Sequence, residues 1–83
     1  MNVETRVREF LKNELGKDVT GVGPDDSLLE SGMIDSVAVM QLVAFLETTY
    51  RIRVAEDDLM PENFDTLGAI AIFVNQRVAG ARD

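Results

Sequence analysis

Apolar side chains recur along the chain with the spacing that an amphipathic helix requires. In the first stretch they fall at intervals of one to four positions, and most positions between them are polar: Val3, Val7, Phe10, Leu11 and Leu15. That period gathers the apolar side chains on one face, so we predict a helix over residues 3–15 with Gly16 as its C-terminal stop.

A second amphipathic stripe lies near the other end of the chain and predicts a helix over residues 66–78. Its members are Leu67, Ile70, Ala71, Val74 and Val78, with Phe73 beside them. Either Asp65 or Thr66 is expected to cap this helix, and Gly68 in its first turn should weaken it slightly.

The most apolar stretch lies in the middle of the chain and predicts a helix over residues 36–50. It carries two stripes: Val39, Leu42, Val43, Leu46 and Tyr50 form the first, and Val37, Met40 and Ala44 form the second. One stripe is enough to build a core, so the second either packs on another element or stays exposed as a contact surface. Asp35 and Ser36 both suit the N-cap position.

The long segment between the first two helices is rich in glycine and aspartate but carries a short element of its own. Ser27 and Glu30 have the spacing of a capping box, which predicts one helical turn over residues 27–31. Leu28 and Leu29 within that turn are expected to pin the loop to the core.

The segment before the last helix predicts a connector over residues 51–54 and a short helical turn over residues 55–59, closed by Pro61. Together these elements predict an all-α fold, a small antiparallel bundle of three main helices plus one or two short ones. The length of 83 residues makes residues 1–83 a single domain.

Composition removes several classes of chemistry. The chain has no cysteine and no histidine, so we expect no ordinary zinc site, no Ser–His or Cys–His nucleophile pair and no other metal site. No catalytic residue is predicted, although a small enzyme that works with carboxylates stays open. Because no long apolar segment is present, we expect no membrane insertion, a cytoplasmic location and, by default, a monomer.

The net charge of −7 is concentrated in the middle of the chain. Residues 18–76 contain eleven acids and two bases, a net charge of −9. Such a field repels nucleic acid and steers basic protein surfaces toward it. The simpler interpretation is that the acids keep a small protein soluble.

Ser36 has one distinctive chemical property, its place at the start of a predicted helix after a flexible loop. A phosphate attached to its hydroxyl would lie against the helix N-terminus, where free N–H groups and the helix dipole favour negative charge. The alternative is that Asp35 and Ser36 are ordinary capping residues.

The order of residues in this region resembles the acyl carrier protein family. The segment from Ser27 through Gly32 to the Asp35-Ser36 pair is similar to the family pattern L-x-x-x-G-x-x-D-S, and the later segments follow the family order. The resemblance as a whole covers about residues 3–78. The resemblance implies that Ser36, flanked by Asp35, carries 4′-phosphopantetheine derived from coenzyme A. The thiol of that arm would hold an acyl or aminoacyl group as a thioester.

The resemblance also implies partner enzymes: a phosphopantetheinyl transferase, a loading ligase or acyltransferase, and downstream synthase or tailoring enzymes. These enzymes would contact the central helix and the loop before it. The candidate partner-binding residues are apolar near the serine and acidic farther away: Met33, Ile34, Val37, Met40, Glu47, Glu56 and Asp57.

One departure from the family pattern suggests a dedicated pathway. Carriers for fatty-acid synthesis show several acids along the central helix, whereas Glu47 is the only one here. We therefore expect a discrete carrier in specialised biosynthesis, of polyketides, nonribosomal peptides or related products. The alternatives are an aminoacyl or D-alanyl carrier for modification of the cell envelope, and an unmodified helical protein-interaction module.

Overall fold

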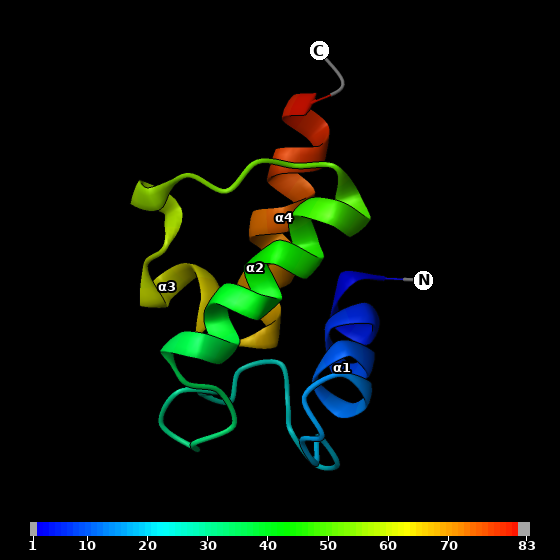
Figure 1. Cartoon of the computed structure of the whole chain (residues 1–83), viewed down its shortest axis with the longest axis vertical. Coiled ribbons are helices and arrows are strands. Elements are labelled where there is room, and N and C mark those ends of the chain that lie inside the picture. Colours follow the sequence, from blue (N-terminus) through cyan, green and yellow to red (C-terminus); the bar gives the residue numbers. More distant parts are fainter. Residues whose placement is uncertain (1, 82–83) are drawn as a thin grey trace.

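The computed structural model describes the backbone of residues 2–81 and the side chains of residues 2–79. Three main helices form a bundle, with shorter helical segments between the second and third of them (Figure 1). The elements are α1 (Val3–Asn13), α2 (Ser36–Tyr50), the 3₁₀ turn η1 (Glu56–Asp58), α3 (Pro61–Phe64) and α4 (Leu67–Ala81). No strand occurs among the described residues, so the predicted all-α class is confirmed.

The core forms where the apolar faces of α1, α2 and α4 meet. Most of its members belong to the predicted stripes, and the loops add Leu28, Ile34, Ile52 and, from α3, Phe64. The helical members are Val3, Val7, Phe10, Leu11, Ala38, Leu42, Val43, Leu46, Leu67, Ile70, Phe73 and Val74. No polar or charged side chain is buried within the described part of the chain, so burial of apolar surface is the main stabilising contribution.

Helix α1 ends two residues earlier than its apolar pattern suggests. Asn2 caps its start by accepting a 2.8 Å hydrogen bond from the Thr5 N–H. At the other end Gly16 adopts a left-handed φ of 65°, and the Lys17 N–H donates to the Leu11 carbonyl at 2.9 Å. The chain therefore turns at the predicted glycine, while Leu15 still packs against the core from outside the helix.

Helix α2 has the predicted bounds, and its two apolar stripes differ in burial. Leu42, Val43 and Leu46 of the first stripe are buried, together with Ala38. In the second stripe Val37 is 68% exposed and Met40 is 55% exposed. The second stripe is therefore a surface feature.

Proline 61 begins a helix instead of closing one, which corrects the prediction for this segment. The 3₁₀ turn covers Glu56–Asp58, inside the predicted span, and Pro61 is then the first residue of α3. The missing N–H of proline costs nothing at this position, because the first N–H groups of a helix have no intrahelical partner.

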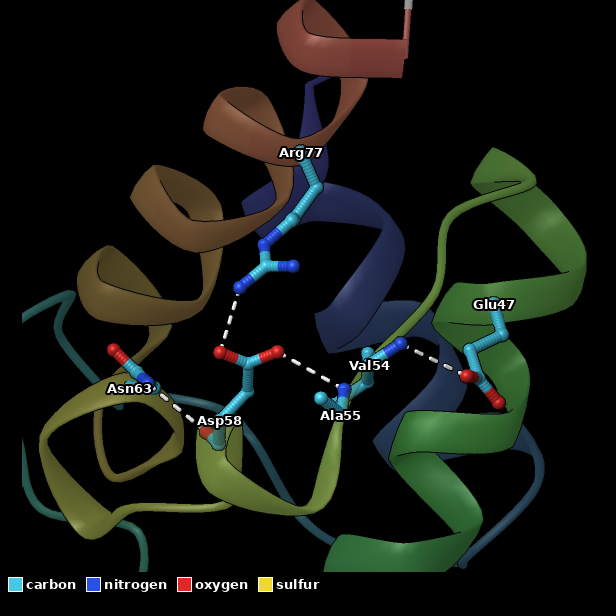
Figure 2. A network of polar contacts seen from close by, with 6 residues as sticks. All are labelled: Glu47, Val54, Ala55, Asp58, Asn63 and Arg77. Atoms are coloured by element: carbon cyan, nitrogen blue, oxygen red, sulfur yellow. Dashed lines mark hydrogen bonds and ion pairs between the residues drawn. The ribbon is translucent and has the colours of Figure 1, made fainter.

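Asp58 ties this short-helix segment to α4 (Figure 2). Its carboxylate accepts a 2.9 Å hydrogen bond from the Ala55 N–H and lies 2.6 Å from Nη2 of Arg77. Its backbone carbonyl accepts from the Asn63 side chain at 2.9 Å. The Arg77 guanidinium also lies 4.9 Å from the centre of the Phe73 ring. The carboxylate and the backbone carbonyl of Asp58 together therefore join η1, α3 and α4.

We predict that Asp58→Ala destabilises the fold by about 1–2 kcal/mol, because it removes a charged partner from one backbone N–H and from Arg77. The change should lower the midpoint of thermal unfolding, which circular dichroism measures. Asp57→Ala is the matched control, since Asp57 is exposed and should tolerate the change. Equal midpoints for the two variants would contradict the role assigned to Asp58.

Candidate functional site

Ser36 is the first residue of α2, and its side chain is exposed. Asp35 caps the helix: its carboxylate accepts from the Ala38 N–H at 2.8 Å, and its carbonyl accepts from the Val39 N–H at 2.9 Å. The capping alternative for Ser36 is therefore wrong. Among the described residues nothing forms a hydrogen bond with the Ser36 hydroxyl, which leaves it available for chemistry.

The start of α2 is favourable for an anionic group. The N–H groups of Ser36 and Val37 precede the first intrahelical hydrogen bond, which the Val39 N–H makes to Asp35. These N–H groups and the positive end of the helix dipole lie close to the Ser36 side chain. A phosphate attached there is chemically compatible with its surroundings.

The loop before α2 is anchored in the core by two apolar side chains. Leu28 is fully buried and Ile34 is 3% exposed. The Ile34 N–H donates to the Leu28 carbonyl at 3.1 Å, and the Leu28 N–H donates to the Asp65 carbonyl at 2.7 Å. Leu29 was expected to share this role, but 38% of its surface is exposed. The two anchors fix the loop that leads directly into Ser36.

Asp65 holds the same loop with its side chain instead of capping α4. Its carboxylate accepts from the Ser27 hydroxyl at 2.8 and 2.9 Å and from the Leu29 N–H at 3.1 Å. Thr66 takes the capping role, because its hydroxyl accepts from the Ala69 N–H at 3.0 Å. The sequence predicted either Asp65 or Thr66 as the cap. Because the Asp65 carboxylate binds the distant loop at Ser27 and Leu29, Thr66 is the capping residue.

The predicted turn after Ser27 is present, although it is not a regular helix. The Ser27 hydroxyl accepts from the Glu30 N–H at 3.0 Å, and the Ser27 carbonyl accepts from the Ser31 N–H at 3.2 Å. Gly32 then reverses the chain with a φ of 77°. The hydrogen bond predicted from the Glu30 N–H to the Ser27 hydroxyl is thus confirmed, within a turn instead of a helix.

Gly68 is a positioning residue that the sequence pattern did not identify. Its N–H donates to the Pro24 carbonyl at 2.9 Å, and a Cβ added to Gly68 would lie 3.1 Å from that oxygen. A glycine early in a helix signalled only a small loss of helix propensity. Its contribution here is to let the loop approach α4 closely.

The predicted contact residues do not all reach the surface. Val37 and Met40 are well exposed beside Ser36, and Met33 is half-buried. Ile34, by contrast, belongs to the core at 3% exposure, so the structure does not support its prediction as a contact residue. The apolar side chain of Ile34 instead anchors the loop in the core.

The predicted acidic contacts fall into two groups. Glu56 and Asp57 are exposed on η1, and so is Asp35, predicted as the flank of Ser36, while it caps α2. Glu47 is half-buried and accepts a 2.9 Å hydrogen bond from the Val54 N–H (Figure 2). Because Glu47 is the only charged residue of α2 and is engaged in this way, the exposed side of α2 near Ser36 is uncharged.

Among the described residues, two ionisable groups have displaced pKa values. Hydrogen bonds from the backbone N–H and the hydroxyl of Thr20 lower the pKa of Asp18. Burial raises the pKa of Tyr50, while the nearby Arg6 charge acts in the opposite direction. Tyr50 ends α2 at the far end from Ser36, so its titration does not affect the candidate site. The described residues contain no cluster of metal ligands and no helix that could cross a membrane.

Comparison with known proteins gives a consistent family signal. The sequence profile described as "Phosphopantetheine attachment site" matches residues 5–74. The chain is 32% identical over 77 residues to the anthracycline acyl carrier protein DauA of Streptomyces sp. (strain C5), covering 90% of this chain and 89% of that protein. It is 31% identical over 72 residues to the acyl carrier protein of Exiguobacterium sibiricum, covering 87% and 89%.

A solved structure shares the fold at a TM-score of 0.70. The match has 28% sequence identity and covers 81% of this chain and 96% of the other, whose structure is titled "Crystal structure of FAD-dependent dehydrogenase". Since most of one chain covers nearly all of the other, the matched chain is similar in size to this one.

We predict that Asp35→Ala destabilises the protein by about 1 kcal/mol, because it removes the side-chain acceptor of the Ala38 N–H. Asp35→Asn keeps an acceptor and should cost much less. Ser36→Ala should change the free energy of unfolding by less than about 0.5 kcal/mol, since its hydroxyl makes no stabilising contact. Urea denaturation measures all three, and a larger loss for Ser36→Ala than for Asp35→Ala would overturn the assignment of the cap.

Proposed function

Because this chain belongs to the acyl carrier protein family, whose members carry covalently attached 4′-phosphopantetheine and are not themselves enzymes, we propose that Ser36 is its attachment residue. The protein is then a discrete carrier. It holds an acyl or aminoacyl intermediate as a thioester on the arm and presents it to pathway enzymes.

The observation that carries the assignment is the state of the three serine hydroxyls. The Ser27 hydroxyl donates to Asp65, and the Ser31 hydroxyl donates to the Leu28 carbonyl at 3.2 Å. The Ser36 hydroxyl is exposed and has no such partner among the described residues. Of the three serines in the chain, Ser36 is therefore the one that a transferase can modify without breaking a hydrogen bond.

The bound arm supplies the thiol that a chain without cysteine lacks. The residues of this protein have the simpler tasks of holding the arm and orienting it. Asp35 keeps the first turn of α2 in place, and the free N–H groups of Ser36 and Val37 face the phosphate end. The anchored loop holds the serine at the surface of the bundle.

The partners follow from the carrier role. The family implies a phosphopantetheinyl transferase and synthase enzymes in general, and we add a loading ligase or acyltransferase and downstream tailoring enzymes. Val37 and Met40 supply an apolar contact, with Met33 at its edge. Methionine suits a surface that must fit several partners in turn. The exposed acids Asp35, Glu56 and Asp57 steer basic partner surfaces, and Glu47 adds a charge that is already hydrogen-bonded.

Specialised biosynthesis is the pathway class that the relatives favour. Two similar proteins are named as anthracycline acyl carrier proteins, DauA of Streptomyces sp. (strain C5) and DpsG of Streptomyces peucetius, each at 32% identity. The uncharged exposed side of α2 agrees with a carrier that serves a dedicated set of enzymes. The match to a chain in a dehydrogenase structure adds one candidate downstream step, the oxidation of the tethered group by a flavin enzyme. A D-alanyl carrier or an unmodified interaction module is the competing interpretation.

We predict that the purified protein gains the mass of one phosphopantetheinyl group when incubated with coenzyme A and a broad-specificity transferase. Ser36→Ala should abolish the gain and keep the fold, because the Ser36 hydroxyl is not part of the hydrogen-bond network. Ser31→Ala is the matched control and should still be modified. No mass gain on the folded wild type, also after coexpression with the transferase, would favour the unmodified interaction module.

A second prediction tests the contact surface next to Ser36. Met40→Glu should raise the KM of the transferase for the carrier about tenfold, since it places a charge in an apolar contact that contributes more than about 1 kcal/mol. Ile72→Glu is the matched control, because Ile72 is 62% exposed on α4, outside the proposed surface. Equal KM values for the two variants would exclude Met40 from the contact.

A further inference from the structure

The two ends of α2 carry opposite charge. The loop between α1 and α2 lies at the end of the bundle where α2 begins, beside Ser36 (Figure 1). Residues 18–36 contain five acids and no base, and all five acids are exposed: Asp18, Asp25, Asp26, Glu30 and Asp35. We call these five residues the acidic end.

The other end of α2 is basic. Residues 48–55 contain Arg51 and Arg53 and no acid, and both arginines are exposed. Exposed Arg6 of α1 lies on the same side of the bundle, because it lines one groove together with Thr48 of α2. Arg6, Arg51 and Arg53 form the basic end.

The arginines of the basic end have no carboxylate partner among the side chains of residues 2–79. The ion pair found within that part of the chain joins Arg77 to Asp58. Glu47, one turn before Arg51, accepts a hydrogen bond from the Val54 N–H instead. The chain then runs across the bundle to the acids of η1 (Figure 1). The positive charge of the basic end therefore faces solvent and any approaching partner.

Arg51 holds its charge at a position that favours glycine. It ends α2 in the left-handed conformation with a φ of 54°, and among the described residues it alone of the non-glycine residues has a positive φ. The helix dipole favours a base at this end of α2, which accounts for Arg51. The dipole fades beyond the last turn, so it does not account for Arg53.

The distance between the two ends decides which charge a partner senses. Helix α2 has 15 residues. Its length is therefore about 22 Å. Charge interactions at physiological salt are screened over about 8 Å, much less than this length. A charged partner surface therefore senses the end that it approaches, and not the net charge of −7 of the whole chain.

We propose that the basic end orients the carrier on partner enzymes whose docking surface is basic, an inference that rests on the proposed attachment at Ser36. Such a surface is attracted to the acidic end and repelled by the basic end, so collisions in the reversed orientation are disfavoured. The encounters that persist are those in which Ser36 faces the partner. The competing interpretation is that the basic end binds an acidic segment of a partner.

The test compares two double variants of equal net charge. Arg51→Gln/Arg53→Gln removes two bases from the basic end. Lys12→Gln/Lys17→Gln removes two bases from the last turn of α1 and the loop after it, beside the acidic end. Each changes the net charge from −7 to −9, two positive charges fewer. Stopped-flow mixing of the apo carrier with a basic transferase measures association and dissociation, and circular dichroism confirms that each variant is folded.

At about 0.1 M salt the arginine variant should associate about twofold more slowly and the lysine variant about twofold faster, because only the first loses the repulsion of reversed collisions. Arg51→Lys/Arg53→Lys should keep the wild-type rate. The differences should vanish at about 1 M salt, where screening acts over about 3 Å. Equal acceleration of both double variants would overturn the inference, because net charge alone would then set the rate. Faster dissociation of the arginine variant at an unchanged association rate would overturn it in favour of an acidic partner segment.

A measurement without a partner tests the division of charge itself. A cationic and an anionic nitroxide of similar size enhance the relaxation of nearby amide protons according to their local concentrations, which follow the local potential. The cationic probe should act more strongly at Glu30 and Ser31, and the anionic probe at Arg51 and Arg53. A cationic preference at both ends would overturn the inference. A wild-type chain that gains no pantetheinyl mass would instead contradict the proposed function, whatever the probes show.

Discussion

The hydrogen bond from the Ala38 N–H to the Asp35 carboxylate fixes where α2 begins, and the rest of the site depends on that choice. A helix that starts at Ser36 turns Leu42, Val43 and Leu46 toward the core and leaves Val37 and Met40 outside. Starting one residue later or earlier would rotate these side chains by about 100° relative to the loop. The cap also frees the Ser36 hydroxyl, which is the property that a modifying enzyme needs.

The cap is supported by a second set of contacts that brings distant parts of the chain together. Asp65 and Gly68, at the start of α4, bind the loop at Ser27, Leu28 and Pro24. Buried Ile34 anchors the loop in the core just before α2 begins. A small domain with a thin core thus positions Ser36 through a few polar contacts at the end of the bundle.

The sequence pattern was sufficient for the elements that local periodicity determines. The stripes of α1, α2 and α4 predicted all three helices, because one apolar face must be buried in each. Local periodicity could not predict the roles of Asp65, Gly68 and Ile34, since each depends on a contact between segments far apart in the chain. Pro61 shows a related ambiguity, because proline is compatible with both the residue after a helix and the first residue of one.

Ser36 was predicted as the attachment residue from its place at a helix start together with the resemblance of the surrounding residues to a carrier family. The structure adds how its hydroxyl differs from those of the other two serines. The most direct test of the account is tandem mass spectrometry of peptides from the protein purified from its native cells. The account predicts one phosphopantetheine group, located on Ser36, with the native acyl or aminoacyl cargo on its thiol. A protein that carries no arm in those cells, or carries it on Ser27 or Ser31, would contradict the account.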